Sequence, residues 1–275
     1  MCEDCRWTGD IQDFDPRVQR KNDVGSFGHK IIIAEIIIND YCLILTQDKK
    51  GFDMKIHYLI YDDMTALDLI GPAQVWNFFP DIEAKFVAKS HDPITTDSGM
   101  VFSPTHTFDE VTSSPDILFV PGGTGGAGAA AVDETTLEFL HEQGQKASWV
   151  TSVCTGAMIL GAAGLLDGYK AATHWGAMQF LPQFGAIPTD ARYVIDRNRA
   201  TGGGVTSGID FGLATMAEIS SESLARMAQL ALEYTPAPPF VSGHPREAKS
   251  ETLALLEKEA GDFDFKKLFG HLKKK

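Results

Sequence analysis

Short apolar runs that alternate with helix-forming segments constrain the fold of this chain more than any other feature. Residues 55–61, 84–89, 116–120 and 149–151 each read as a buried strand, because they are enriched in apolar and β-branched side chains. Helical segments lie between these runs. Strands that alternate with helices at this spacing predict a parallel sheet with helices on both faces. We therefore predict an α/β fold with three layers and a mostly parallel central sheet.

The other segments are less regular. Residues 94–107 are predicted to form a hairpin with its turn at Asp97-Ser98-Gly99. One long amphipathic helix is expected at 207–234, and the stretch Pro236-Ala237-Pro238-Pro239 would end it. The remaining expected elements are helices at 68–78, 134–143 and 175–181, and short strands at 169–172, 191–195 and 199–200.

A change of composition near residue 53 divides the chain. Residues 54–245 form the main predicted domain, because the regular pattern runs through them. Residues 1–53 form an N-terminal extension that we expect to be poorly structured or non-native; a separate hypothesis is that translation begins at Met54. Residues 246–275 are a helical and basic C-terminal tail, and 266–275 should be solvated and frayed.

The charge of the chain restricts its partners. The 275 residues carry a formal net charge of −13, and nucleic-acid binding needs a basic face, so no nucleic acid is expected. The most apolar stretch, 31–45, contains Glu35, Asn39 and Asp40 and is too short to span a bilayer, so no membrane is expected. The start of the chain lacks the apolar segment of a signal peptide. We expect a cytoplasmic protein.

The cysteines agree with that expectation. Cys2, Cys5 and Cys42 lie in the extension, which leaves Cys154 as the single thiol of the main domain and excludes a disulfide framework there. Cys2 and Cys5 have the spacing of half a zinc site, but no second pair of ligands follows, so no metal is expected. No cofactor is expected either, because the glycine run at 122–128 is not followed by the lysine of a phosphate loop and no dinucleotide fingerprint is present.

Cys154 lies in Ser152-Val153-Cys154-Thr155-Gly156-Ala157, between a predicted strand and a helix of small residues. A cysteine on such a turn faces free amide N–H groups, which lower the pKa of a thiol and favour a nucleophile. A buried structural cysteine is the alternative. Asp68 and Gly122-Gly123 also follow predicted strands. Since the carboxyl ends of parallel strands meet at one edge, we expect these residues to gather there with Cys154.

Five motifs together resemble the ThiJ/PfpI superfamily, which is related to class I glutamine amidotransferases. The resemblance extends over about 54–245 and implies a flavodoxin-like fold. Within the superfamily, the motifs are most similar to those of isonitrile hydratases, also called cyclohexyl-isocyanide hydratases. The five motifs are Leu67-Asp68-Leu69-Ile70-Gly71-Pro72, Val120-Pro121-Gly122-Gly123, Thr151-Ser152-Val153-Cys154-Thr155-Gly156, Ala172-Thr173-His174-Trp175 and Thr201-Gly202-Gly203-Gly204.

This resemblance implies a hydro-lyase that converts an isocyanide, R–NC, and water to the N-substituted formamide. Cys154 would attack the terminal carbon to give a covalent thioimidate, which water then resolves. Asp68 stands where many superfamily members carry a glutamate, and it would act as the acid and base that shares a proton with the thiolate. The alternative role for Asp68 is a helix N-cap.

The resemblance also suggests roles for the neighbouring residues. Thr155 replaces the histidine of protease-like members, which counts against peptidase activity; its N–H would face the sulfur and its hydroxyl would bind the substrate nitrogen or water. An ordinary residue of the first helical turn is the alternative. The amides of Gly122 and Gly123 would stabilise developing negative charge. His174 would orient water or pack at the edge of the cleft. The expected pocket wall includes Trp76, Phe79, Trp175 and Tyr234.

A second interpretation is a cysteine-based redox or small-molecule sensor, because the ligand domains of AraC-type regulators carry similar motifs. Those regulators continue into a DNA-binding unit of about 100 residues with two helix-turn-helix motifs, whereas about thirty-five residues follow the proline-rich stretch here. That length favours the enzyme. The expected partners are a small-molecule isocyanide and a second copy of the chain in a homodimer.

Overall fold

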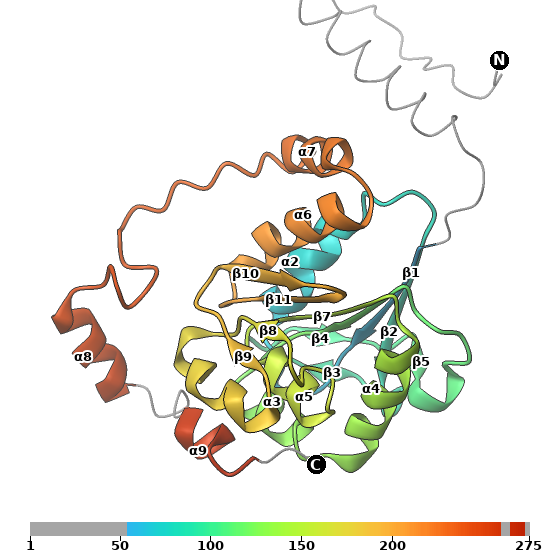
Figure 1. Cartoon of the computed structure of the whole chain (residues 1–275), viewed down its shortest axis with the longest axis horizontal. Coiled ribbons are helices and arrows are strands. Elements are labelled where there is room, and N and C mark those ends of the chain that lie inside the picture. The colour runs from blue at the N-terminus through green and yellow to red at the C-terminus, as the bar shows by residue number, and fades with distance from the viewer. Residues whose placement is uncertain (1–53, 260–264, 273–275) are drawn as a thin grey trace, which may run out of the picture. The chain divides into compact units, whose positions relative to one another are not determined.

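A seven-stranded sheet runs through the centre of the described part of the protein (Figure 1). The structure is a computed structural model that describes residues 54–259 and 265–272. The expectations for residues 1–53, including the start at Met54 and the Cys2 and Cys5 pair, lie outside the described residues.

The strands of this sheet confirm the α/β prediction. Every neighbouring pair is parallel except β10 and β11, which are antiparallel. The spatial order is β10 (Tyr193–Asp196), β11 (Arg199–Gly202), β7 (Trp149–Val153), β6 (Ile117–Val120), β1 (Met54–Leu59), β2 (Ile82–Ala88) and β5 (His106–Thr107). Two small pairs stand apart: β3 (Ile94–Thr95) with β4 (Val101–Phe102), and β8 (Lys170–Ala171) with β9 (Ile187–Pro188).

Strand β6 shows why a continuous apolar run becomes a central strand. All of its residues are buried, since helices cover both faces of the sheet. Leu118 and Val120 belong to one hydrophobic core, whereas Ile117 and Phe119 belong to the other, as the alternation of side chains along a strand requires.

Helices cover each face and complete the three layers (Figure 1). One core contains side chains of α2 (Ala66–Trp76), α6 (Ser207–Ile219) and α7 (Glu222–Ala231). The other contains side chains of α3 (Gly125–Ala130), α4 (Glu134–Lys146), α5 (Gly156–Ala162) and the 3₁₀ helix η2 (Trp175–Phe184). None of the helices in the described ranges combines the length and apolar character that a bilayer-spanning segment requires.

The prediction of one long helix at 207–234 is wrong, because this segment forms two helices, α6 and α7. α6 ends at Ile219, and Ser221 adopts an extended conformation with φ of −160°. The Ser221 hydroxyl then accepts a hydrogen bond from the N–H of Leu224 and caps α7. Serine bonds to nearby backbone groups outside helices and thereby competes with a continuous helix. The Ser220-Ser221 pair was the signal for this break.

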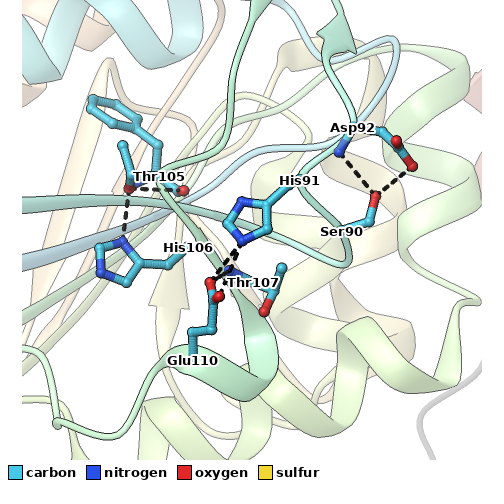
Figure 2. Close-up of polar contacts among 8 residues, drawn as sticks. Ser90, His91, Asp92, Thr105, His106, Thr107 and Glu110 are labelled. Carbon is cyan, nitrogen blue, oxygen red and sulfur yellow. Dashed lines mark hydrogen bonds and ion pairs between the residues drawn. The ribbon is translucent and has the colours of Figure 1, made fainter.

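The expected hairpin at 94–107 is confirmed only in its first half. β3 and β4 pair across a turn at 97–99, but β5 leaves them and joins the main sheet parallel to β2. Figure 2 shows the polar contacts that hold this edge. The Thr105 hydroxyl donates a hydrogen bond to the Phe86 carbonyl at 3.2 Å, and the Glu110 carboxylate accepts from the N–H of Thr107 and contacts His91 at 3.0 Å.

The C-terminal region also differs from its prediction. After α7 the chain continues to α8 (Ser250–Glu259) and α9 (Phe265–Phe269). Phe265, Phe269 and Leu272 are buried in the core that also contains side chains of α3, α5 and η2, so the solvated tail predicted at 266–275 is wrong for Phe269 and Leu272. Their apolar spacing among lysines is the pattern of a short amphipathic helix.

Candidate active site

Cys154 occupies the sharp turn between β7 and α5, as the sequence predicted. Its φ is +57°, a left-handed conformation that costs free energy for a residue with a Cβ and is frequent at functional sites. Two backbone contacts hold it there. The Cys154 N–H donates to the carbonyl of Gly203 at 2.7 Å, and the Thr173 hydroxyl donates to the Cys154 carbonyl at 2.7 Å.

Asp68 lies in the first turn of α2 and reaches the same edge of the sheet. Its carboxyl lies close enough to the Cys154 thiol for each group to affect the pKa of the other, and its Oδ2 accepts a hydrogen bond from the N–H of Gly122 at 3.0 Å. The N-cap position of α2 is Thr65, so the capping alternative for Asp68 is wrong. Oδ1 of Asp68 is buried and has no hydrogen-bond partner among the described residues.

Gly122 brings the two groups together because it has no side chain. A Cβ at this position would lie 2.7 Å from Oδ2 of Asp68 and 2.8 Å from Cβ of Cys154. Any other residue would therefore push the carboxyl and the thiol apart. The sequence prediction located Gly122 at the site, but its amide is bonded to Asp68 rather than bare.

Thr155 and Gly123 form a second buried contact beside the sulfur. The Thr155 hydroxyl donates to the Gly123 carbonyl at 2.6 Å and accepts from the Gly123 N–H at 2.9 Å. Both expected oxyanion amides, those of Gly122 and Gly123, thus already have partners. The backbone N–H of Thr155 does face the Cys154 sulfur and acts to lower its pKa, as expected.

Burial nevertheless controls the proton affinity of this pair. It raises the pKa of Asp68 to about 7, although the Gly122 N–H and the thiol act in the opposite direction. Burial also raises the pKa of Cys154 well above its ordinary value, and the neighbouring Asp68 charge adds to that effect. The lowered thiol pKa predicted from the turn is therefore wrong: removal of water outweighs the Thr155 amide. Cys154 is 6% exposed to solvent.

His174 lies at the wall of a cavity whose lining includes Thr173 and Gly203, which are hydrogen-bonded to the Cys154 backbone, but not Cys154 or Asp68. The cavity has a volume of about 490 Å³ and is also lined by Trp175. Nδ1 of His174 accepts a hydrogen bond from the Gly176 N–H at 3.2 Å. Burial lowers its pKa to about 4, so the imidazole is neutral at physiological pH.

Sequence reasoning missed two residues of this region. Thr173 holds the Cys154 carbonyl, and Tyr61 donates its hydroxyl to the Pro121 carbonyl at 2.9 Å. Burial raises the pKa of Tyr61 far above its ordinary value, and the charges of Asp68 and Cys154 contribute, which places its hydroxyl near the pair. The position of Tyr61 at the end of the first predicted strand, 55–61, was the signal that it lies at this edge of the sheet.

Three of the expected pocket-wall residues lie elsewhere. Trp76 is completely buried between α2 and α6, and its indole N–H donates to the Gly212 carbonyl at 3.1 Å. Phe79 is also buried in that core. Trp175 is 41% exposed and does line the cavity. Tyr234 does not line it, and its hydroxyl donates a hydrogen bond to Asp210.

Among the described residues, no group of three or more His, Cys, Asp or Glu side chains could hold a metal ion.

Comparisons with known proteins agree with this geometry. Residues 54–218 match the DJ-1/PfpI family. The chain is 44% identical over 207 residues to an isonitrile hydratase from Pseudomonas putida, covering 75% of this chain and 90% of that protein. It is 39% identical to a ThiJ/PfpI family protein from Pseudomonas syringae, with a TM-score of 0.78 and coverage of 93% of this chain and 99% of that one.

A more distant relative belongs to the regulators. The HTH-type transcriptional regulator GbdR from Pseudomonas aeruginosa is 26% identical over 166 residues, which cover 58% of this chain and 44% of the regulator. The match therefore covers less than half of the regulator, whereas it covers most of the hydratase. The family match covers more than half of the sequence, and the fold shared with the solved ThiJ/PfpI structure agrees with it. The chain therefore belongs to the DJ-1/PfpI family.

Proposed function

We propose that this protein is an isonitrile hydratase that converts R–NC and water to the N-substituted formamide. The observation that carries the proposal is the close approach of Cys154, across Gly122, to a buried Asp68 carboxyl whose pKa is raised to about 7. Such a pair supplies a nucleophile and a transferable proton on the same side of a substrate. The likeness to an isonitrile hydratase over most of the chain supports this substrate class.

The first step joins sulfur to the terminal carbon of the isonitrile. As the electron pair of Cys154 sulfur attacks, the thiol proton passes to the Asp68 carboxylate, and Asp68 delivers it to the same carbon. The S–H bond breaks, S–C and C–H bonds form, and the product is a thioimidate, R–N=CH–S–Cys. A thiolate does not have to exist beforehand, which agrees with the raised pKa of Cys154.

The second step returns the enzyme to its starting state. Asp68 removes a proton from water while the water oxygen attacks the thioimidate carbon, and Asp68 then passes that proton to the substrate nitrogen and becomes a carboxylate again. The tetrahedral adduct, R–NH–CH(OH)–S–Cys, then breaks its C–S bond. The leaving sulfur recovers a proton from the hydroxyl through Asp68, and R–NH–CHO is released.

Neighbouring residues would support this chemistry. Gly122 orients Asp68, and the Thr155 N–H stabilises the sulfur when charge develops on it, as their contacts suggest. Gly123 acts through Thr155 rather than as a free amide. His174 presents a hydrogen-bond donor to the substrate or water from the cavity wall.

The test is direct hydration of cyclohexyl isocyanide. The purified protein should form N-cyclohexylformamide, detected by gas chromatography with mass spectrometry. Cys154→Ser and Cys154→Ala should reduce turnover by at least about 10³-fold, as the loss of a nucleophile does. The matched control replaces Cys2, Cys5 and Cys42 by serine and should keep wild-type turnover. In this control variant Cys154 is the single remaining thiol. After quenching with acid during turnover, mass spectrometry of the variant should show an increase equal to the mass of one substrate molecule.

Absence of formamide at millimolar substrate, with a titratable Cys154 thiol, would contradict the proposal and favour the ligand-sensor alternative. The similarity to GbdR supports that alternative.

We also propose a homodimer and a cytoplasmic location. Light scattering after size-exclusion chromatography tests the first, and fractionation of cells tests the second. A domain spanning 54–245, with the segment that follows it docked on its core, is the arrangement we propose for one protomer.

A further inference from the structure

Phe265, near the C-terminus, lies against His174 of the candidate site. The two rings stack with their centroids 5.0 Å apart and an angle of 27° between their planes. Phe265 is 9% exposed, although its segment directly precedes residues that the sequence suggested would be solvated. A side chain of α9 is therefore in contact with a residue that lines the cavity.

The surroundings of His174 fit a flat ring at this place. Gly176 approaches Phe265 so closely that a Cβ at position 176 would lie 2.5 Å from Cε2 of the phenyl ring. Trp175 contacts the imidazole as well, with a centroid distance of 5.2 Å. Aromatic contacts at these separations fix ring orientation as well as bury apolar area.

This packing also determines which nitrogen of the imidazole is available. Nδ1 accepts a hydrogen bond from the Gly176 N–H, so the proton of the neutral ring is on Nε2. The Cδ2–Nε2 edge faces Gly204, where an added Cβ would lie 3.2 Å from Cδ2. Gly204 lines the cavity of about 490 Å³. Nε2–H is therefore on the edge of the ring that lies against Gly204, and both residues line the cavity.

We propose that Phe265 is a positioning residue for His174: its ring fixes the imidazole so that the Nε2–H group donates a hydrogen bond into the cavity beside Cys154. The acceptor there is the substrate nitrogen or the attacking water, and in this respect the inference rests on the proposed function. The orientation of the ring itself does not depend on that function.

The charges around His174 allow it to remain a neutral donor. Burial lowers its pKa to about 4. The ionisable groups that line the same cavity are Asp190, Arg192, His244, Arg246 and Glu247, and Asp190 contacts both His244 and Arg246. Lys266 and Lys267, which follow Phe265 on α9, are exposed. None of these groups is altered by a substitution at Phe265.

The test compares Phe265→Leu, Phe265→Tyr and Phe184→Leu in the full-length protein. Leucine at 265 removes the flat ring, whereas tyrosine keeps it. Phe184→Leu is the matched control, because Phe184 is fully buried in the same core but packs against Gly161. Each variant is measured by thermal unfolding, by the pH titration of the His174 ring signals in NMR, and by kcat/KM for cyclohexyl isocyanide. His174→Gln assigns the signals.

Phe265→Leu should admit water to the imidazole and raise its pKa to above about 5. It should lower kcat/KM at least about tenfold, since misplacement of a group by about 1 Å can cost 10²-fold. Phe265→Tyr should restore both values. Phe184→Leu should lower Tm but leave the His174 titration unchanged and kcat/KM within about twofold at a temperature well below Tm.

The inference is overturned if Phe265→Leu lowers Tm as Phe184→Leu does while the His174 titration and kcat/KM stay at wild-type values. Phe265 would then be a core residue and nothing more. If the wild-type protein hydrates no isonitrile, the proposed function fails, and the His174 titration alone decides whether Phe265 positions the ring. The two failures are therefore distinguishable.

Discussion

The contact between Cys154 and Asp68 is governed by the cost of placing charge in a buried site. A lone amide at a turn favours a thiolate, but removal of water from both groups favours their neutral forms more strongly. The pair is best described as one titrating unit whose proton can move between sulfur and oxygen. Addition of a thiol across one carbon needs such a unit, because the nucleophile and the proton go to the same atom.

This description predicts how activity depends on pH. Asp68 must be a carboxylate to accept the thiol proton, and burial raises its pKa to about 7, so kcat/KM should rise with pH and level off above about 8. Asp68→Asn should lose at least about 10²-fold in kcat/KM and lose this ascending limb. Rate measurements between pH 5 and 9 check both. An activity that falls as pH rises through 7 would show that the protonated carboxyl begins the reaction instead.

At the scale of the elements, the sequence predicts what local pattern determines. The apolar run at 117–120 and the turn at Cys154 were assigned correctly, because each needs only its own residues. No helix was predicted in the glycine run after Gly122, yet Gly125–Ala130 forms α3, where Gly126 packs against the backbone of Asp63. Close tertiary contact, and not helix propensity, stabilises that helix. The pKa of Cys154 was missed for a similar reason, since burial is decided by distant segments.

The break between α6 and α7 gives a prediction at this scale. Ser221→Ala removes the acceptor for the Leu224 N–H and should lower the free energy of unfolding by about 1 kcal/mol. Ser220→Ala is the matched control and should change it by less than about 0.5 kcal/mol. Urea denaturation measures both. Equal effects of the two substitutions would mean that the Ser221 hydroxyl does not cap α7.

At the scale of the whole molecule, two cores share one sheet, and the site lies where their strands end. The C-terminal helix α9 adds Phe265 and Phe269 to one core, and Phe265 extends from that core to His174. Contacts that stabilise the fold and contacts that orient the site are therefore partly the same. Substitutions in this core should be separated into the two classes by measuring unfolding and activity together.

Acid stability is a property of the whole molecule, because every buried base contributes to it. Burial and the nearby Lys85 lower the pKa of His57 to about 4, whereas the unfolded chain takes up the proton near 6.5. The unfolded state therefore gains protons first as pH falls from 7 to 5, and the native state loses stability. His57→Leu should reduce this loss by about 1 kcal/mol, allowing for solvent near the ring. The comparison is the difference in unfolding free energy between pH 7 and 5, with exposed His91→Leu as control. An equal pH dependence in wild type and His57→Leu would show that His57 takes up its proton in the folded protein as readily as in the unfolded chain.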